Sequence, residues 1–453
     1  MKIIPLQYSH SQIEISVPDN AHVLCAAKVE PLANPSAEVL RSLKEPIAAR
    51  PLHQLARGRQ TAAIVVSDNT RPIPYKGPDG ILPDILKILR QSRVNNIKII
   101  VGCGTHRPMS EPQLRHMLGD EAFGDGIEVI NHMASDESML CSIGRTERTP
   151  NVTVNRHYIN ADLKIVTGLV EPHFMAGFSG GRKAICPGIC GRSVTFGFHS
   201  APILNEKEAT SLVLGPNPCH QEALRIARMA GVDFTINLTL DSNKRITGVF
   251  SGHLEKSHQA AVEHLCTFAM IGLNQIYDVV ITQAGVVGMN HYQCAKAVFE
   301  AARALKPGGR IILLANLTDA EPVGSQNYRD ILRLLTRLGP EDFIQKILAN
   351  DWTFVPDQWQ VQMWAKTLQK LDSPKHLYTC AAQLEGCPDD LVPEVNVASE
   401  IRRFPGECDV DFARRMTQQT IDNLIKNVPD EKILVLPDGP YAVPILREKF
   451  IAS

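Results

Sequence analysis

Short apolar runs bounded by turn residues recur along the first part of the chain and predict the buried strands of a parallel sheet. The clearest runs lie at residues 61–66, 97–101, 127–130 and 163–170. Segments with apolar residues at helical spacing lie between them, for example residues 81–89 and 111–118. Strands that alternate with helices in this way predict an α/β fold.

The same alternation resumes after residue 272, where we expect a second domain. Its strands are predicted at residues 277–282, 310–315, 377–381 and 433–436. Near the N-terminus, alternating apolar and polar residues predict a pair of short strands joined by a turn at residues 18–20. The chain is therefore expected to form two α/β domains, residues 1–272 and 273–453.

The composition is typical of a soluble globular protein that binds small molecules. The 453 residues are 44% hydrophobic, and 47 basic residues face 48 acidic ones, so no charge bias indicates nucleic acid or an anionic membrane as partner. The opening residues lack a signal-peptide pattern and no apolar run reaches membrane-spanning length, so we expect a cytoplasmic protein. Eleven cysteines, an odd number without a CxxC pair, predict reduced thiols.

Polar residues with useful chemistry follow three of the predicted strands. They are Asp68 and Arg71 after the first, His106 and Arg107 after the second, and His173 and Lys183 after the strand at 163–170. In an open α/β sheet, ligands bind beyond the carboxyl ends of parallel strands. We therefore expect these three loops to point towards one edge of the sheet.

The stretch from residue 171 to 200 carries the densest set of such residues. His173 can move protons or bind a metal, the glycine-rich loop 177–181 can offer backbone N–H groups to an anion, and Lys183 can serve as a charge, a nucleophile or an attachment point. The alternative is a tight connection with structural or solvated side chains. The stretch is not a P-loop, because Arg182 and Ala184 stand where Gly and Ser/Thr are required. Residues 102–107 likewise lack the third glycine of a dinucleotide fingerprint.

A helix predicted after Asn290 carries two further polar residues. Asn290 can cap this helix, with Gln293 at its third position. Gln293 and Lys296 share one helical face, where they form either a surface pair or a contact for an anionic substrate.

Taken together, these segments resemble the nickel-dependent lactate racemase family. The resemblance is carried by SDNTRPIP (67–74), GTHR (104–107), HFMAGFSGGRK (173–183), His199, YQCAK (292–296) and DQW (357–359). It implies two α/β domains with the active site in the cleft between them. It also implies a cofactor, the nickel-pincer nucleotide, in which two sulfur-containing arms and a ring carbon hold nickel.

The resemblance assigns a role to each matching residue. Lys183 would hold the cofactor covalently, His199 would be the protein ligand to nickel, and His106 and His173 would be the paired catalytic acid and base. Arg71, Gln293 and Lys296 would bind the substrate. Further cofactor contacts would come from Asp68, Gly177, Ser179, Gly180, Gly181 and Tyr292.

The activity implied is that of a racemase or epimerase that inverts C2 of a 2-hydroxy acid. Removing a proton from C2 would create a carbanion beside a carboxylate, whereas hydride transfer to the cofactor gives a flat 2-keto acid. The substrate is expected to be lactate or a larger 2-hydroxy acid, such as malate, a longer aliphatic or aromatic acid, or a sugar acid. Other proteins would have to synthesise the cofactor. Two alternatives stay open: a pyridoxal-phosphate-type enzyme using Lys183, and a non-catalytic small-molecule-binding homologue.

Overall fold

The computed structural model describes residues 1–427 and 432–447, and the chain divides into two compact units. The first unit comprises residues 28–267, and the second comprises residues 1–27 and 268–453. Within the described ranges, none of the helices combines the length and the apolar character needed to cross a membrane.

The first unit is built on a six-stranded sheet in the order β13-β12-β9-β4-β5-β6. All neighbouring pairs are parallel except β12 and β13. The strands of this sheet are β4 (Thr61–Ser67), β5 (Asn96–Gly102), β6 (Ile127–Asn131), β9 (Leu163–Leu169), β12 (Phe234–Leu240) and β13 (Ile246–Gly252). Two small hairpins are formed by β7 (Leu140–Ser142) with β8 (Thr153–Asn155) and by β10 (Pro172–His173) with β11 (Gly177–Phe178).

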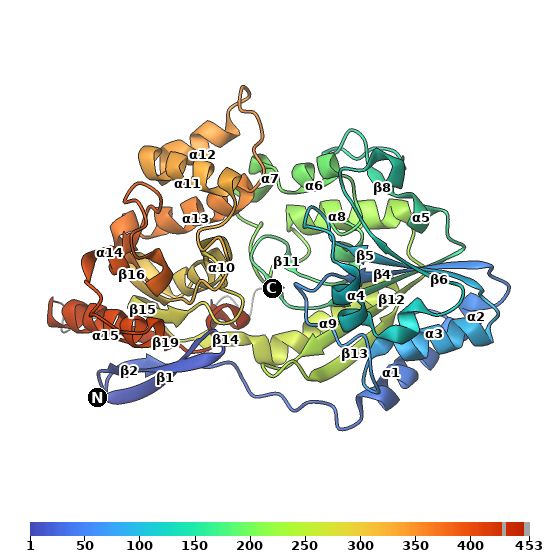
Figure 1. The fold of residues 1–453 in the computed structure, drawn as a ribbon, viewed down its shortest axis with the longest axis horizontal. Coiled ribbons are helices and arrows are strands. Elements are labelled where there is room, and N and C mark those ends of the chain that lie inside the picture. The colour runs from blue at the N-terminus through green and yellow to red at the C-terminus, as the bar shows by residue number, and fades with distance from the viewer. Residues whose placement is uncertain (428–431, 448–453) are drawn as a thin grey trace. The chain divides into compact units, whose positions relative to one another are not determined.

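Helices cover both faces of this sheet, as the apolar character of the parallel strands requires. The helices are α1 (Pro35–Lys44), α2 (Leu52–Ala56), α3 (Ile81–Gln91), α4 (Glu111–Leu118), α5 (Arg156–Ile159), α6 (Arg192–Phe198), α7 (Ala201–Asn205), α8 (Pro218–Ala230) and α9 (Leu254–Ala269). Apolar residues of α1 to α4 form one core with the strands, and α5 and α8 lie on the opposite side (Figure 1).

The second unit contains a six-stranded, fully parallel sheet in the order β18-β17-β16-β15-β19-β3. Its strands are β3 (His22–Val23), β15 (Tyr277–Gln283), β16 (Leu305–Leu314), β17 (Leu377–Cys380), β18 (Val395–Asn396) and β19 (Ile433–Leu436). Two smaller pairs are β1 (Lys2–Tyr8) with β2 (Ser11–Val17) and β14 (Met270–Leu273) with β20 (Val443–Leu446).

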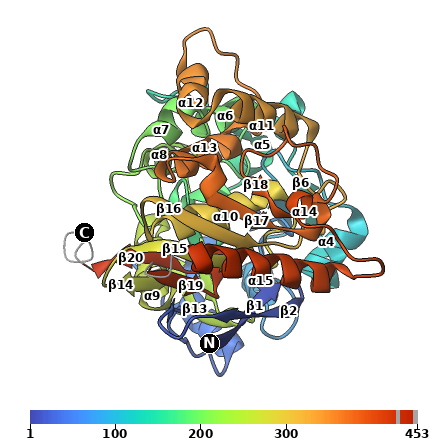
Figure 2. The same ribbon diagram turned by 90° about the vertical axis from the view of Figure 1, so that its left-hand side faces the viewer.

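The helices of the second unit are α10 (His291–Ala302), α11 (Gln326–Leu338), α12 (Pro340–Leu348), α13 (Gln358–Lys370), α14 (Val397–Glu400) and α15 (Asp409–Asn427). Figure 2 shows α15 running beside the β1–β2 hairpin. Together with α14, these elements share a core with the sheet. The prediction of an α/β fold with two parallel-sheet units is confirmed.

The N-terminal residues belong to a different unit from the one expected. Residues 1–27 were assigned to the first domain, but β3 pairs in parallel with β19, with His22 opposite Leu434. The predicted pairing across residues 18–20 is also wrong: β2 pairs with β1 through a turn at Ser9 and His10, and the chain after residue 20 joins the distant sheet. Local alternation predicts a strand but does not identify its partner.

Candidate functional site

The candidate site lies where the strand order of the first unit changes direction. From β4 the chain proceeds outward to β5 and β6, and then returns to add β9 on the other side of β4. Such a switch point leaves a crevice outside the carboxyl ends of the two central strands. Because β9, β4 and β5 are parallel neighbours, the loops after all three strands emerge at one edge, as the sequence predicts.

His106 and Asp68 are joined by a hydrogen bond between two of these loops. Nδ1 of His106 lies 2.6 Å from Oδ2 of Asp68, whose side chain is 7% exposed against 61% for His106. Burial raises the pKa of Asp68, but hydrogen bonds from His106 and Thr70 outweigh it and hold the pKa below its usual value. Asp68 is therefore an ionised acceptor, so Nδ1 of His106 carries a proton and Nε2 is left as the basic nitrogen of the neutral ring.

His173 has the opposite arrangement of its ring nitrogens. Its Nδ1 accepts hydrogen bonds from the backbone N–H groups of Met175 and Ala176, at 3.3 and 3.1 Å. In the neutral ring the proton is therefore on Nε2. The neutral forms of the two histidines thus differ at Nε2: that of His106 has a lone pair that can accept a proton, and that of His173 carries an N–H that can donate a hydrogen bond.

Lys183 lies in a short 3-10 turn, Gly181–Ala184, that follows the glycine-rich loop. Burial, followed by the positive charges of Arg182 and Arg71, lowers the pKa of its amine to about 7. Nζ lies 5.0 Å from the centre of the Phe198 ring. A half-buried lysine whose amine is about half neutral near pH 7 is a competent nucleophile and attachment point.

His199 ends helix α6 and is held by the preceding turn. Its Nδ1 donates to the carbonyl oxygen of Thr195 at 2.9 Å, and its ring meets that of Phe198 edge to face. Burial and the charge of Lys183 lower the pKa of His199 to about 3. Donation from Nδ1 places the lone pair on Nε2, which is the usual second-sphere arrangement of a metal-binding histidine.

His199 would have to bind a metal with ligands from outside the protein. Among residues 1–427 and 432–447, no three His, Cys, Asp or Glu side chains lie close enough to hold a metal ion by themselves. A single neutral imidazole near a lysine of lowered pKa fits a nickel ion that arrives within an organic cofactor attached to Lys183. The donor chemistry of Lys183 and His199 is therefore compatible with the group that the sequence resemblance implies.

Arg71 is oriented by Glu171, a residue to which the sequence analysis assigned no role. Its Nε lies 3.5 Å from Oε2 of Glu171, and its Nη1 donates to the carbonyl oxygen of Thr70 at 3.2 Å. Glu171 is itself fixed by Ser179, which bonds both its backbone N–H and its carbonyl. The position of Glu171, directly after the end of a buried strand, is the signal that could have identified it.

The glycine-rich loop turns most of its amides inward. The N–H of Ser179 donates to Glu171, that of Gly181 to Asn237, and that of Lys183 to Gly180. The glycines are required by close packing: a Cβ on Gly177, which has φ 77°, would collide with the carbonyl oxygen of Val213. Packing accounts for the loop's residue types, and cofactor contacts by Gly177, Ser179, Gly180 and Gly181 stay a prediction.

Arg182 stabilises the conformation of the glycine-rich loop. No role was predicted for it from the sequence. Arg182 is 1% exposed, and its guanidinium donates to the carbonyl oxygens of Ala176 and Phe178, at 2.9 and 2.8 Å, and to His258. Burial lowers the pKa of Arg182 to about 9. The sequence feature that could have identified this role is an arginine between a glycine pair and the lysine, in a stretch that is otherwise almost wholly apolar.

The second unit positions the remaining predicted residues on helix α10. Tyr292, Gln293 and Lys296 are all partly exposed, whereas Cys294 and Ala295 between them are buried. Asn290 caps the helix by accepting from the backbone N–H of Gln293, at 3.0 Å, as the sequence predicts. The hydroxyl of Tyr292 accepts from Nε1 of Trp359 at 2.8 Å, and burial raises the pKa of Tyr292.

Comparison with known proteins links both units to one family. The family model described as the lactate racemase N-terminal domain matches residues 8–211, and that of the lactate racemase C-terminal domain matches residues 274–374. A protein named lactate racemase from Thermoanaerobacterium thermosaccharolyticum is 30% identical over 99% of this chain and 100% of its own length. Another of that name, from Lactiplantibacillus plantarum, is 31% identical over 81% of this chain and 87% of its own.

Solved structures agree with these matches. The lactate racemase apoprotein from T. thermosaccharolyticum superimposes with a TM-score of 0.83 at 27% identity, covering 98% of this chain and 100% of that one. A Thermotoga maritima protein with a TM-score of 0.60 and 13% identity, covering 93% of this chain and 100% of its own, shares the fold.

Proposed function

The chain belongs to the lactate racemase family, whose members are isomerases, and we propose that it inverts the C2 carbon of a 2-hydroxy acid, with lactate as the first candidate substrate. The single observation that carries the proposal is the complementary state of His106 and His173. One ring is held with a basic Nε2 and the other with a protonated Nε2. An enzyme that works in both directions at one carbon needs a base and an acid that can exchange roles.

We propose that the cofactor is a nickel-pincer nucleotide held covalently by Lys183, with His199 as the protein ligand to nickel. The lowered pKa of the Lys183 amine and the oriented imidazole of His199 support this assignment. When bound, the group would supply a hydride acceptor next to the substrate's C2, which lets the acid pass through a planar 2-keto state.

The protein's own residues would do the remaining work. Nε2 of His106, held in line by Asp68, would take the proton of the substrate hydroxyl. His173 would donate a hydrogen bond from Nε2 to the oxygen and, when protonated to the imidazolium, would return a proton there for the opposite configuration. Arg71 would bind the substrate carboxylate with its guanidinium, while Gln293 and Lys296 would hold the carboxylate and the hydroxyl. The positive charges of Arg71 and Lys296 would also retain the 2-keto acid until the hydride returns to it, because an acid released earlier would leave the reaction incomplete.

The test is a chiral assay on protein made in cells that also synthesise the cofactor. L-lactate should be converted to a mixture of the two enantiomers, and the assay extends to malate, longer aliphatic or aromatic hydroxy acids, and sugar acids. Failure to exchange the configuration of any of these acids would contradict the proposal. A borohydride-reducible imine on Lys183 without nickel would favour the pyridoxal-phosphate alternative. Binding of an acid without exchange would favour a non-catalytic homologue.

Two further expectations from the sequence belong to this proposal. The protein would act in the cytoplasm, and separate synthesis proteins would supply its cofactor. Protein from a host without that synthesis pathway should then carry an unmodified Lys183.

A further inference from the structure

A fully buried pair of ionisable side chains lies at the start of helix α10 and has no role in the proposed reaction. Nε2 of His291 is 2.8 Å from Oε1 of Glu394, and both side chains are 0% exposed. Nδ1 of His291 is 2.8 Å from the hydroxyl of Tyr328. The ring also stacks on Trp364, with centroids 4.5 Å apart and planes 12° from parallel.

Stability alone is a poor explanation for this pair. Burial alone would raise the pKa of Glu394, but the charge and hydrogen bond of His291 have the larger combined effect. The pKa is therefore below its usual value, and the carboxylate stays ionised. Its Oε1 also accepts from Thr379 at 3.1 Å, but Oε2 is buried without a hydrogen-bond partner within the described residues. Apolar residues of similar volume usually stabilise such a site as well as a buried ion pair does. The pair instead adds orientational specificity, because its hydrogen bonds fix one orientation of each side chain.

The residues on either side of His291 are fastened in the same way to other elements. Nδ2 of Asn290 donates to Oδ2 of Asp319, in the loop after β16, at 2.8 Å. The hydroxyl and the carbonyl oxygen of Tyr292 accept from Trp359 and Gln360 of α13, at 2.8 and 2.5 Å. Three consecutive residues at the start of α10 are thus tied to three different parts of the second unit.

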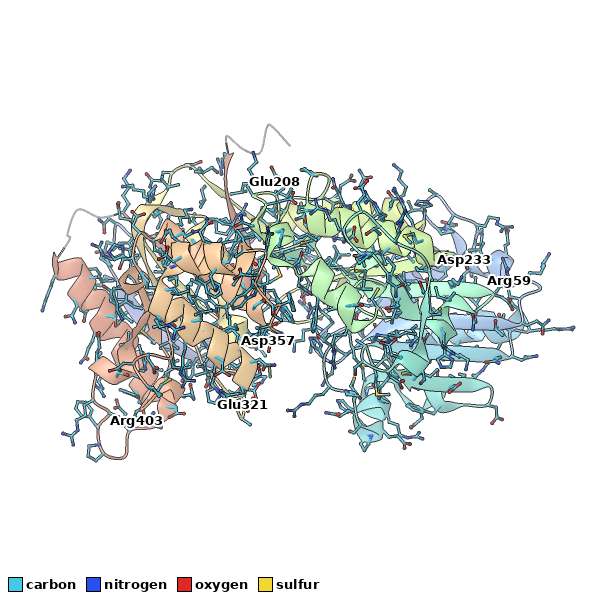
Figure 3. The ribbon with its side chains drawn as sticks, turned by 90° about the horizontal axis from the view of Figure 1, so that it is seen from above. Arg59, Glu208, Asp233, Glu321, Asp357 and Arg403 are labelled. Carbon is cyan, nitrogen blue, oxygen red and sulfur yellow. The ribbon has the colours of Figure 1, made fainter. Side chains whose placement is uncertain are left out.

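The start of α13 is itself fixed to the start of α11. Asp357, labelled in Figure 3, has a left-handed backbone with φ 72° and accepts from Oγ of Ser325 at 2.6 Å. Ser325 caps α11, and α11 carries the Tyr328 that contacts His291. The contacts therefore close a ring through α10, α11 and α13, and a shift of the first turn of α10 would break several of them at once.

We propose that His291 and Glu394 are positioning residues that fix the first turn of α10, and so set the direction in which Gln293 and Lys296 meet the substrate. This inference rests on the proposed function, which places those two side chains at a 2-hydroxy acid. Neither His291 nor Glu394 would touch the substrate. A misplacement of about 1 Å in groups that orient a substrate can cost on the order of 100-fold in rate.

Four variants separate positioning from core filling. His291→Phe combined with Glu394→Leu keeps the site apolar and filled, and should fold with a melting temperature close to that of the wild type. Glu394→Leu alone leaves His291 and Thr379 without their acceptor. Glu394→Gln keeps an oxygen for both donors and is the conservative replacement. Lys306→Met, which removes an ion pair with Asp278 elsewhere in the same unit, is the matched control.

Hydrogen exchange of the peptide containing residues 290–296 is the first measurement, because it does not depend on turnover. The apolar double variant should exchange these amides at least about tenfold faster than the wild type at similar melting temperature. The single variant Glu394→Gln should exchange them as slowly as the wild type does. Lys306→Met should leave this peptide unchanged. Wild-type exchange in the apolar double variant would overturn the inference, whether or not the protein proves to be a racemase.

Kinetics of the cofactor-loaded enzyme are the second measurement. The apolar double variant should lose about tenfold in kcat/KM for the preferred hydroxy acid, mainly through KM, with the mass adduct on Lys183 unchanged. Unchanged kcat/KM in that variant, alongside an active wild type, would also overturn the inference. A wild type that exchanges no hydroxy acid would count against the proposed function, and hydrogen exchange would still decide whether the pair orders α10.

Discussion

The carboxylate of Asp68 lies 2.6 Å from Nδ1 of His106, so a buried acid on the loop after β4 sets the protonation of an exposed histidine on the loop after β5. The sequence resemblance places Asp68 at the cofactor. The contact gives it a second role, since it determines which nitrogen of His106 can act as a base. The two residues are 38 positions apart and are brought together because β4 and β5 are parallel neighbours.

Replacing Asp68 with Asn should lower kcat on the order of 100- to 1,000-fold. The amide of Asn would donate to Nδ1 and move the proton of His106 to Nε2, which removes the basic nitrogen. Steady-state rates across pH 5 to 9 check this. Asp162→Asn is the control, because Asp162 is an exposed acid that binds Thr61 at the opposite end of β4. A variant at Asp68 with wild-type rates would show that Asp68 does not control His106.

The amine of Lys183 should react with an acylating reagent at lower pH than typical surface lysines. Its pKa is lowered from 10.5 to about 7 by burial and by Arg182 and Arg71, so half of the amine is neutral near pH 7. Pulse labelling of cofactor-free protein, read by peptide mass spectrometry, should show half-maximal labelling of this residue near pH 7. Labelling that rises only above pH 9 would contradict the lowered pKa.

The same shift has a consequence for stability with a defined sign. The folded protein loses the Lys183 proton before the unfolded chain does, so the penalty for burying the charged amine is full below pH 7 and falls as pH rises towards 10.5. Lys183→Met should therefore raise the melting temperature of cofactor-free protein more at pH 6 than at pH 9.

Replacing Arg182 with Met should destabilise the first unit on the order of 3 kcal/mol, because buried carbonyl groups of the glycine-rich loop lose their donors. Denaturant unfolding measures the effect. Arg41→Met is the matched control: Arg41 is half exposed and pairs with Glu38 on α1, and a surface pair of this kind contributes at most about 1 kcal/mol. Equal stability of the two variants would show that Arg182 is dispensable for the loop.

Replacing His199 with Ala should remove nickel while leaving the organic adduct on Lys183. Nε2 of His199 is the proposed ligand, whereas attachment requires only the neighbouring amine. Metal analysis and intact mass of the same sample distinguish the two losses. Nickel content equal to that of the wild type would contradict the assignment of His199.

The α/β fold could be predicted from the sequence because the central strands are buried on both faces and therefore appear as continuous apolar runs. The strand expected at 163–170 is observed as Leu163–Leu169, and that at 277–282 as Tyr277–Gln283. Which strands pair with each other was harder to predict from the sequence. The pairing of β3 with β19 joins residues about 400 positions apart, and no local pattern encodes such a contact.

Strand boundaries near glycine and proline were also misplaced. The strand predicted at 310–315 is observed as Leu305–Leu314, so that residues 306–309, with one proline and two glycines, lie inside β16. A register shift between Tyr277 and Val279 of the neighbouring β15 absorbs the irregular segment. Glycine and proline often mark the end of a strand, but a sheet can also accommodate them within a strand as a bulge.

The site residues were named from motifs, but the state of each side chain was not predictable. The proton positions of His106 and His173 follow from a carboxylate and two backbone amides that only the folded chain brings to them. The low pKa of Lys183 likewise depends on its burial beside Arg182 and Arg71. The sequence supplies the reactive groups, and the fold determines their protonation.

The most direct test of the central claim is the intact mass of the protein from cells that make the pincer cofactor, combined with metal analysis of the same sample. Such protein should carry a nucleotide-sized adduct that maps to the peptide containing Lys183, together with about one nickel per chain. Unmodified Lys183 in protein from such cells, with no nickel bound, would contradict it.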